Sequence, residues 1–222
     1  SVRRVDGKLV LTREGSAVEI ANPESVVFNL RAGEVLTGTA DAFNNLRITG
    51  SGSVVLSAVT SSVTTQPVAI NLSQIAGASL SLAVPTSVTL DATSNIGQFK
   101  VRTASGQTLT LSAAQADGKS INGTGSVTVT GLGAGGSPVN LTGVISAGNL
   151  LAQTAPGAVI SASTLLNPRF VIRSADATSP AQPLTIAASV ANGRTIRASG
   201  EMVVTGIGAS TTDLSKVQSI GN

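Results

Sequence analysis

The sequence contains no cysteine and no histidine in 222 residues. Disulfide bonds are therefore excluded, and so are the Ser–His and Cys–His pairs that activate many nucleophilic enzymes. Two carboxylates would suffice for a glycosidase, but the acidic residues cluster near the N-terminus instead of recurring along the chain. Six of the eleven lie before residue 42, namely Asp6, Glu14, Glu19, Glu24, Glu34 and Asp41. We interpret them as the polar end that a repeat array needs, and we expect a protein that is not an enzyme.

Tryptophan and tyrosine are also absent, and charged residues make up only 11 % of the chain, with a net charge of +3. Proteins that bind single-stranded nucleic acid combine basic grooves with aromatic stacking platforms, and duplex binders carry dense Lys and Arg clusters. Because neither pattern is present, nucleic acid is not an expected partner. The sequence also has no apolar run of about 18 residues, so we expect no insertion into a membrane.

What the sequence does contain is typical of β-strands. Hydrophobic residues make up 41 % of the chain, and the shortage of aromatic residues leaves valine, leucine, isoleucine and alanine to build the core. Valine, isoleucine and threonine favour strands because their branched Cβ fits a pleated surface. Long helix-period patterns are missing. The composition therefore predicts an all-β protein.

A strand paced by glycine occurs three times: ITGSGSVVLSA begins at Ile48, INGTGSVTVTG at Ile121 and IRASGEMVVTG at Ile196. Two further motifs recur at nearly the same spacing in the sequence. One is a Phe-x-aliphatic-Arg motif, and the other has the form INLSQI, VNLTGV or TDLSKV. The repeat divides the chain into three units, residues 1–75, 76–147 and 148–222. The chain begins and ends at boundaries of the repeat. We therefore expect it to be a stretch of a longer array in preference to a small protein made of three units.

Strand signals spaced by roughly ten residues fit two architectures. The first is a β-solenoid resembling a parallel β-helix, and the second is a row of three small β-sandwich domains. Small side chains, few aromatic residues and a unit too short to be stable by itself favour the solenoid, in which each unit stacks on its neighbours. The length of one coil stays open, because steps of about 20 and about 30 residues are both visible.

The Phe-x-aliphatic-Arg motif supplies the most regular candidate site. Arg31, Arg102 and Arg173 occupy equivalent positions and are candidates for a repeated surface ladder that faces an anionic polymer. The simpler interpretation is a buried phenylalanine beside a solvated arginine, because alternate residues of a strand point to opposite faces.

Glycine and aspartate positions indicate turns. Gly50 and Gly52, like Gly123 and Gly125, are expected at a turn or bulge with positive φ, and the DGK motif at Asp117 is a two-residue turn signal. The GLGAGG motif at Gly131 matches a dinucleotide fingerprint, but a strand-like run follows it where a helix is needed. We expect no cofactor. Ca²⁺ is conceivable, but no motif supports it, since calcium needs six to eight oxygen ligands.

The LTLSAAQADGKSINGTGSVTVTG stretch that begins at Leu109 resembles the Gly/Thr/Val-rich β-strand repeats of large secreted bacterial surface proteins, such as adhesins and S-layer-like proteins. The resemblance implies an extracellular structural or adhesive segment at the bacterial cell surface, acting as a stalk, a filament or a surface-layer element. Its expected partners are copies of itself or other cell-surface polymers. The alternative is a ligand-binding adhesin or phage-fibre module that recognises a glycan or a protein receptor.

Overall fold

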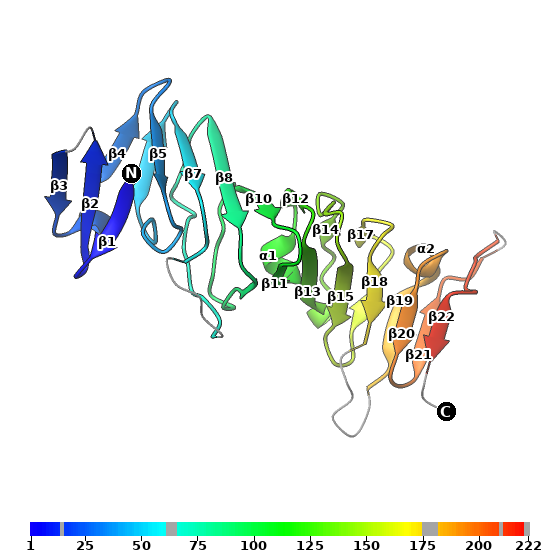
Figure 1. The fold of residues 1–222 in the computed structure, drawn as a ribbon. Helices are drawn as coiled ribbons and strands as arrows, with labels where there is room; N and C mark the ends of the chain where they lie inside the picture. Colours follow the sequence, from blue (N-terminus) through cyan, green and yellow to red (C-terminus); the bar gives the residue numbers. More distant parts are fainter. Residues whose placement is uncertain (14–15, 61–65, 175–181, 209–210, 220–222) are drawn as a thin grey trace.

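The computed structural model describes residues 1–13, 16–60, 66–174, 182–208 and 211–219. Parallel strands stack on one another to form a β-solenoid of about 9 turns, with only 7 % helix (Figure 1). This arrangement confirms the predicted all-β solenoid. The alternative of three separate β-sandwiches is wrong, because strands pair without interruption across both predicted unit boundaries: β7 pairs with β8, and β13 pairs with β15.

The N-terminal end of the solenoid carries the one antiparallel sheet of the described residues. Its strands are β1 (Val2–Val5), β2 (Lys8–Arg13) and β3 (Ser16–Ile20), in that order. Val2 and Leu9 point from this sheet into the core, and the remaining side chains are mostly exposed. The first unit therefore begins with a cap, which fits the polar end that the acidic residues predicted.

Two large parallel sheets form the main faces of the solenoid. The five-stranded sheet contains β5 (Val35–Gly38), β7 (Ser53–Leu56), β8 (Ser79–Val84), β10 (Lys100–Thr103) and β12 (Ile121–Gly123). The seven-stranded sheet contains β9 (Val88–Thr89), β11 (Thr108–Ser112), β13 (Ser126–Leu132), β15 (Leu150–Thr154), β18 (Val171–Arg173), β20 (Ile196–Ala198) and β22 (Val217–Ser219).

Shorter elements complete the coils. Small parallel sheets are formed by β4 (Val27–Leu30) with β6 (Arg47–Gly50), by β14 (Asn140–Leu141) with β17 (Leu165–Leu166), and by β16 (Val159–Ile160), β19 (Leu184–Ala187) and β21 (Met202–Thr205). Single helical turns occur at η1 (Pro23–Ser25), α1 (Ala113–Ala116), η2 (Ala134–Gly136) and α2 (Ala188–Ala191).

The coils differ in length, which explains why the sequence shows no fixed coil period. The step in sequence from Leu36 to its partner Val54 is clearly shorter than the step from Ile48 to its partner Ile75. Three coils together make up one sequence repeat. In the second unit, for example, Val101 stacks on Ile121, and Ile121 stacks on Val144.

The strand that carries the Phe-x-aliphatic-Arg motif changes sheet from the second unit to the third. In the second unit this strand is β10, which belongs to the five-stranded sheet. Its counterpart in the third unit is β18, which belongs to the seven-stranded sheet, because β15 pairs with β13 on one side and with β18 on the other. Equivalent positions in successive units therefore lie on different faces of the solenoid.

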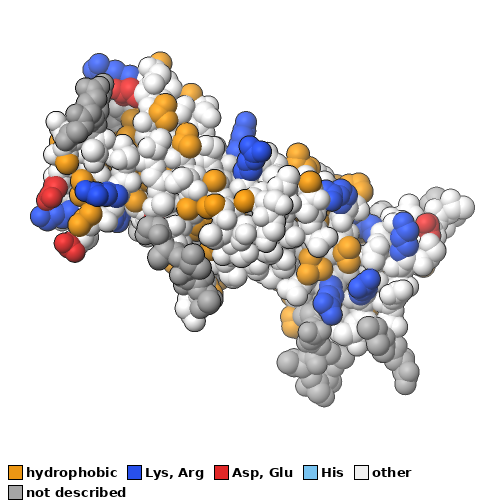
Figure 2. Space-filling model, viewed as in Figure 1, with side chains coloured by type: hydrophobic (Ala, Val, Ile, Leu, Met, Phe, Trp, Pro, Cys, Tyr) orange, Lys and Arg blue, Asp and Glu red, His pale blue; other side chains and the backbone are white. Residues whose placement is uncertain are grey.

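Stacked aliphatic rows fill the interior. One such row consists of Leu111, Val129, Ala152, Ile172 and Ile196, all at most 1 % exposed. Nearly all buried hydrophobic residues belong to one continuous cluster that includes β1 at one end and β20 at the other. Burial of apolar surface therefore holds all coils together as a single cooperative body. Charged side chains are sparse on the surface seen in Figure 2.

Glycines mark places where two coils approach closely. Gly50 and Gly123 have φ of +106° and +116°, so the predicted positive φ is confirmed at these two positions. A Cβ on Gly123 would overlap the carbonyl oxygen of Thr103 in the preceding coil. Gly52 and Gly125 do not have positive φ, and there the prediction is wrong. These two are needed for space, since a Cβ on Gly125 would lie 2.6 Å from the carbonyl oxygen of Gln107.

Candidate functional site

The three arginines of the predicted ladder are all exposed, but they do not form one row. Arg31 follows β4. Arg102, on β10, lies between Ala83 and Asn122 of the neighbouring strands. Arg173, on β18 of the seven-stranded sheet, lies between Gln153 and Arg197. The change of sheet between units separates the three side chains, although their positions in the repeat are equivalent.

Asparagine and aspartate side chains link neighbouring coils at the equivalent turn of each unit. In each unit, a side-chain oxygen accepts a hydrogen bond from a backbone N–H one coil further on. The donor–acceptor pairs are Asn71 N to Asn44 Oδ1 at 2.8 Å, Asn140 N to Asp117 Oδ1 at 2.7 Å, and Asp213 N to Asn192 Oδ1 at 2.8 Å. Asp117 thus has a structural role at a turn in which Gly118 has φ of +65°, as the DGK motif predicted.

The residues that donate these N–H groups form turns of their own. Asn140 Oδ1 accepts the backbone N–H of Thr142 at 3.1 Å, and Asp213 Oδ1 accepts that of Ser215 at 2.9 Å. The Ser215 hydroxyl and N–H together hold the pKa of Asp213 below its ordinary value. Such Asx turns fix the chain locally, so the recurring Asn/Asp-Leu-Ser/Thr motif serves coil geometry.

Basic side chains near these turns satisfy carbonyl groups of the neighbouring coil. Lys119 Nζ donates to Gly97 O at 2.6 Å, and the guanidinium of Arg194 donates to Asn167 O at 2.7 Å and Leu166 O at 2.8 Å. Burial lowers the pKa of Arg194. These contacts were not predicted, although Lys119 of DGK at Asp117 and Arg194 of NGR at Asn192 occupy the same position of the repeat. Arg169 acts similarly on Ala147 O at 2.8 Å.

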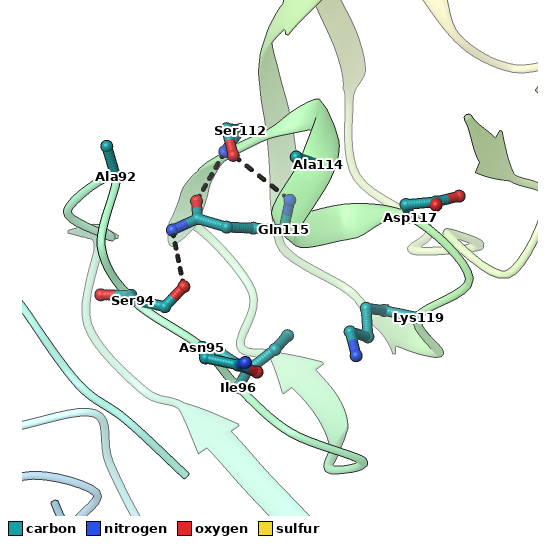
Figure 3. A pocket seen from close by; sticks show the side chains of 9 residues that line it. All are labelled: Ala92, Ser94, Asn95, Ile96, Ser112, Ala114, Gln115, Asp117 and Lys119. Atoms are coloured by element: carbon teal, nitrogen blue, oxygen red, sulfur yellow. Dashed lines mark hydrogen bonds between the residues drawn. The ribbon is translucent and has the colours of Figure 1, made fainter. Parts of the chain in front are cut away.

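A polar cleft of about 320 Å³ lies beside α1 (Figure 3). Ser112 caps α1 by accepting the backbone N–H of Gln115 at 3.2 Å, and the Gln115 side chain accepts the Ser112 N–H at 2.8 Å. The amide of Gln115 also donates to Ser94 O at 3.1 Å. Asp117 and Lys119 line the same cleft. Because these polar groups already bond within the chain, the cleft offers no poised acid, base or nucleophile.

A second cleft of about 390 Å³ lies over β16, β19 and α2. Its lining is largely aliphatic and small, with Val159, Ile160 and Ala188 among the contributors. None of the described residues that line it is ionisable, so it can hold an apolar group but has no means to carry out acid–base chemistry.

The GLGAGG motif forms a tight turn. Gly131, Gly133, Gly135 and Gly136 all have positive φ, and the turn contains only the 3₁₀ helix η2 before the chain continues to β14. A dinucleotide site requires a longer helix directly after the glycines. The motif therefore serves as a turn between two strands, as the strand-like run after it predicted.

No family model, no curated protein and no solved structure matches this chain. Within the described ranges, no three His, Cys, Asp or Glu residues are grouped so that they could hold a metal ion. No helix in the described part of the chain is long and apolar enough to cross a membrane. The geometry of the solenoid is therefore the basis for a functional proposal.

Proposed function

We propose that the chain is a non-enzymatic structural and adhesive segment of an extracellular bacterial surface protein, where it forms part of a stalk, a filament or a surface layer. The observation that carries this proposal is the uninterrupted stack of coils around one core. The Asn and Asp side chains at its turns accept hydrogen bonds from the next coil and are therefore not held free for a reaction. A continuous core and coil-to-coil hydrogen bonds make a stiff element, which is what a stalk requires.

Resistance to proteolysis is expected for the same role. The chain has 14 Lys and Arg residues, and several of them, including Lys119 and Arg194, are held against backbone carbonyls. Trypsin cuts where backbone opens locally, and stacked coils open rarely. We expect the coils to survive trypsin for much longer than an unfolded chain of the same composition would.

Self-association is part of the proposal, because the two ends of the solenoid differ. The N-terminal end is covered by the β1–β3 sheet, whereas β21 and β22 each pair on one side only within the described residues. Val203 on β21 is 39 % exposed, and Ile207 just after it is 62 % exposed. A strand edge with free N–H and C=O groups is a template for pairing with another chain, so we propose that copies associate through this edge.

Sedimentation velocity over a range of protein concentrations tests the edge. We expect the wild-type chain to associate as concentration rises, and Val203→Lys to stay monomeric, because a charge on an edge strand blocks pairing. Val55→Lys is the matched control: Val55 is 40 % exposed on β7, which is paired on both sides, so this variant should still associate.

The outcomes separate the two parts of the proposal. A wild-type chain that stays monomeric at every concentration contradicts self-association but leaves the stalk role in place if trypsin resistance holds. Rapid cleavage inside the coils would contradict both parts.

A ligand-binding adhesin or phage-fibre module is the second candidate. Features that occur in a single unit favour it, because a stalk needs only repeated ones. Gln115 in the α1 cleft has Val190 as its counterpart in the third unit, so the polar lining of this cleft is not repeated. Binding of a glycan or protein receptor that depends on Gln115 would support this second candidate.

A further inference from the structure

Two arginines lie side by side on the outer surface of the seven-stranded sheet. Arg173 on β18 pairs in register with Arg197 on β20, and both side chains are exposed. Neighbouring strands are about 4.8 Å apart. Gln153 and Gln218 extend this line on the two sides. We call Gln153, Arg173, Arg197 and Gln218 the arginine row.

No described residue compensates the positive charges in this row. Like charges directly opposite each other on adjacent strands are destabilising. Other arginines of the same unit, Arg169 and Arg194, donate to backbone carbonyls, but Arg173 and Arg197 make no side-chain hydrogen bond or ion pair with any described residue. The ion pairs of the described residues lie in the N-terminal unit, where Glu24 and Glu19 are the acidic partners.

Figure 2 shows how charged side chains are distributed over one face of the molecule. On this face, most red carboxylate side chains lie at the N-terminal end together with blue Lys and Arg side chains, whereas blue side chains predominate towards the C-terminal end. An approaching anion therefore meets a positive potential over the last coils, and such a potential raises its local concentration.

Serine hydrogen bonds hold the two strands in place next to the arginines. Ser199 donates its backbone N–H to Ser174 Oγ at 2.7 Å, and the two hydroxyl oxygens are 2.9 Å apart. Ser174 follows Arg173 directly, and Ser199 lies shortly after Arg197. The backbones that carry the guanidinium groups are therefore fixed relative to each other, so less order has to be imposed when a ligand binds.

We propose that Arg173 and Arg197 together bind a sulfate or carboxylate group of an acidic polysaccharide that runs along the solenoid axis. A guanidinium group presents a planar fork of N–H donors that matches such oxyanions, and two of them on adjacent strands can share one group. Gln153 and Gln218 supply amide donors and acceptors for the hydroxyls of the flanking sugars. The structural role proposed above does not depend on this site.

A nucleic acid fits this surface less well than a polysaccharide does. Binders of single-stranded nucleic acid stack bases on exposed aromatic side chains, but Phe43, Phe99 and Phe170 are all at most 1 % exposed. Tryptophan and tyrosine are absent. The remaining aromatic residue, Phe28, lies in the first unit and is partly buried against the core.

The test measures binding of the full chain to three immobilised polyanions: heparin, polygalacturonate and single-stranded DNA. At about 0.15 M salt, we expect wild-type protein to bind heparin or polygalacturonate and the Arg173→Gln/Arg197→Gln double variant to bind it about tenfold more weakly or worse. Arg102→Gln is the matched control, because Arg102 holds the equivalent position in the repeat but has Ala83 and Asn122 as neighbours. Its affinity should stay within about twofold of wild type.

The binding results identify the anionic group and test the role of the two arginines. Binding to heparin alone assigns the site to sulfate, and binding to polygalacturonate alone assigns it to carboxylate. The proposal is overturned if wild-type protein binds neither polysaccharide, if Arg102→Gln weakens binding as much as the double variant does, or if DNA binds as tightly as the polysaccharides with the same sensitivity to the double variant. Unchanged thermal unfolding of the variants shows that a loss of binding does not come from a loss of fold.

Discussion

Single glycines set how closely the coils stack. The second glycine of the glycine-paced strand is present in all three copies, at Gly52, Gly125 and Gly200, whereas the first is replaced by Ala198 in the third copy. The structure explains the difference. Gly123 uses a positive φ, but Ala198 does not have one, so β20 takes a path there that an L-residue can follow. Gly125 has no such alternative, because the carbonyl groups of the preceding coil occupy the space of a Cβ.

Replacing Gly125 by alanine should separate two coils. We expect Gly125→Ala to lower the free energy of unfolding by about 3 kcal/mol, since the overlap is with backbone atoms and cannot be relieved by a rotamer change. Gly118→Ala is the control: Gly118 has φ of +65°, but no atom lies within 4 Å of the place that a Cβ would take, so only the strain of a left-handed residue, about 1 kcal/mol, is expected. Urea-induced unfolding measures both, and a Gly125→Ala loss no larger than that of Gly118→Ala would contradict this account.

At the level of elements, the N-terminal cap is attached by one arginine. Arg4 on β1 donates to Asn44 O at 2.8 Å and to Ala42 O at 3.3 Å, and it forms an ion pair with Glu24 at 2.9 Å. The same turn buries Phe43 completely. The Arg4 side chain and the apolar contacts of β1 and β2 together join the antiparallel sheet to the first coil.

Removal of this side chain should loosen the cap and leave the other coils intact. We expect Arg4→Ala to reduce the local opening free energy of residues 2–20 by about 1 kcal/mol, because hydrogen bonds to carbonyls are lost at a partly exposed site. Hydrogen exchange measured by mass spectrometry should show faster exchange there and unchanged exchange after residue 100. Arg3→Ala is the control, since Arg3 is exposed. Equal effects of the two substitutions would argue against an anchoring role for Arg4.

At the level of the whole molecule, carboxyl groups with lowered pKa values are spread along the described part of the chain. The backbone N–H of Glu24 and the Arg4 guanidinium hold the pKa of Glu24 below 4.5. Thr93 holds the pKa of Asp91 below 3.8, chiefly through its hydroxyl, and Ser215 does the same for Asp213. A carboxyl group with a lowered pKa stabilises the fold above its unfolded pKa and loses this contribution as the pH falls through its folded pKa.

The melting temperature should therefore be nearly constant between about pH 5 and pH 8, a range in which histidine and cysteine, both absent here, usually titrate. It should begin to fall below pH 4.5, the ordinary pKa of Glu24, and fall further below pH 3.8, the ordinary pKa of Asp91 and Asp213. Thermal unfolding followed by circular dichroism at a series of pH values measures this dependence. Asp91→Asn should reduce the acid-induced decrease, and a decrease that begins above about pH 5 would show that other groups control the response.

Much of the architecture was predictable because it depends on local pattern. The stretch INGTGSVTVTG predicted a strand, and its Val127 and Val129 are both fully buried on β13. The turn that contains Gly118 followed from its two-residue signal. The structural bonds of Lys119 and Arg194 were not predicted, because their carbonyl acceptors lie in the preceding coil, far from them in sequence. The antiparallel pairing of the cap was not predicted either.

The sequence by itself determined the β-strand content, the three repeated units, the aliphatic interior and the positions that need glycine, since each depends on side-chain size, branching or backbone freedom within a short stretch of chain. Only the tertiary structure decided which repeated residues become neighbours. Unequal coils and the change of sheet between units separate Arg31, Arg102 and Arg173, and they bring Arg173 beside Arg197 instead. The physical reason is that cross-strand neighbours are set by the number of residues in each coil, a quantity fixed by packing between coils and not by the local sequence of either strand.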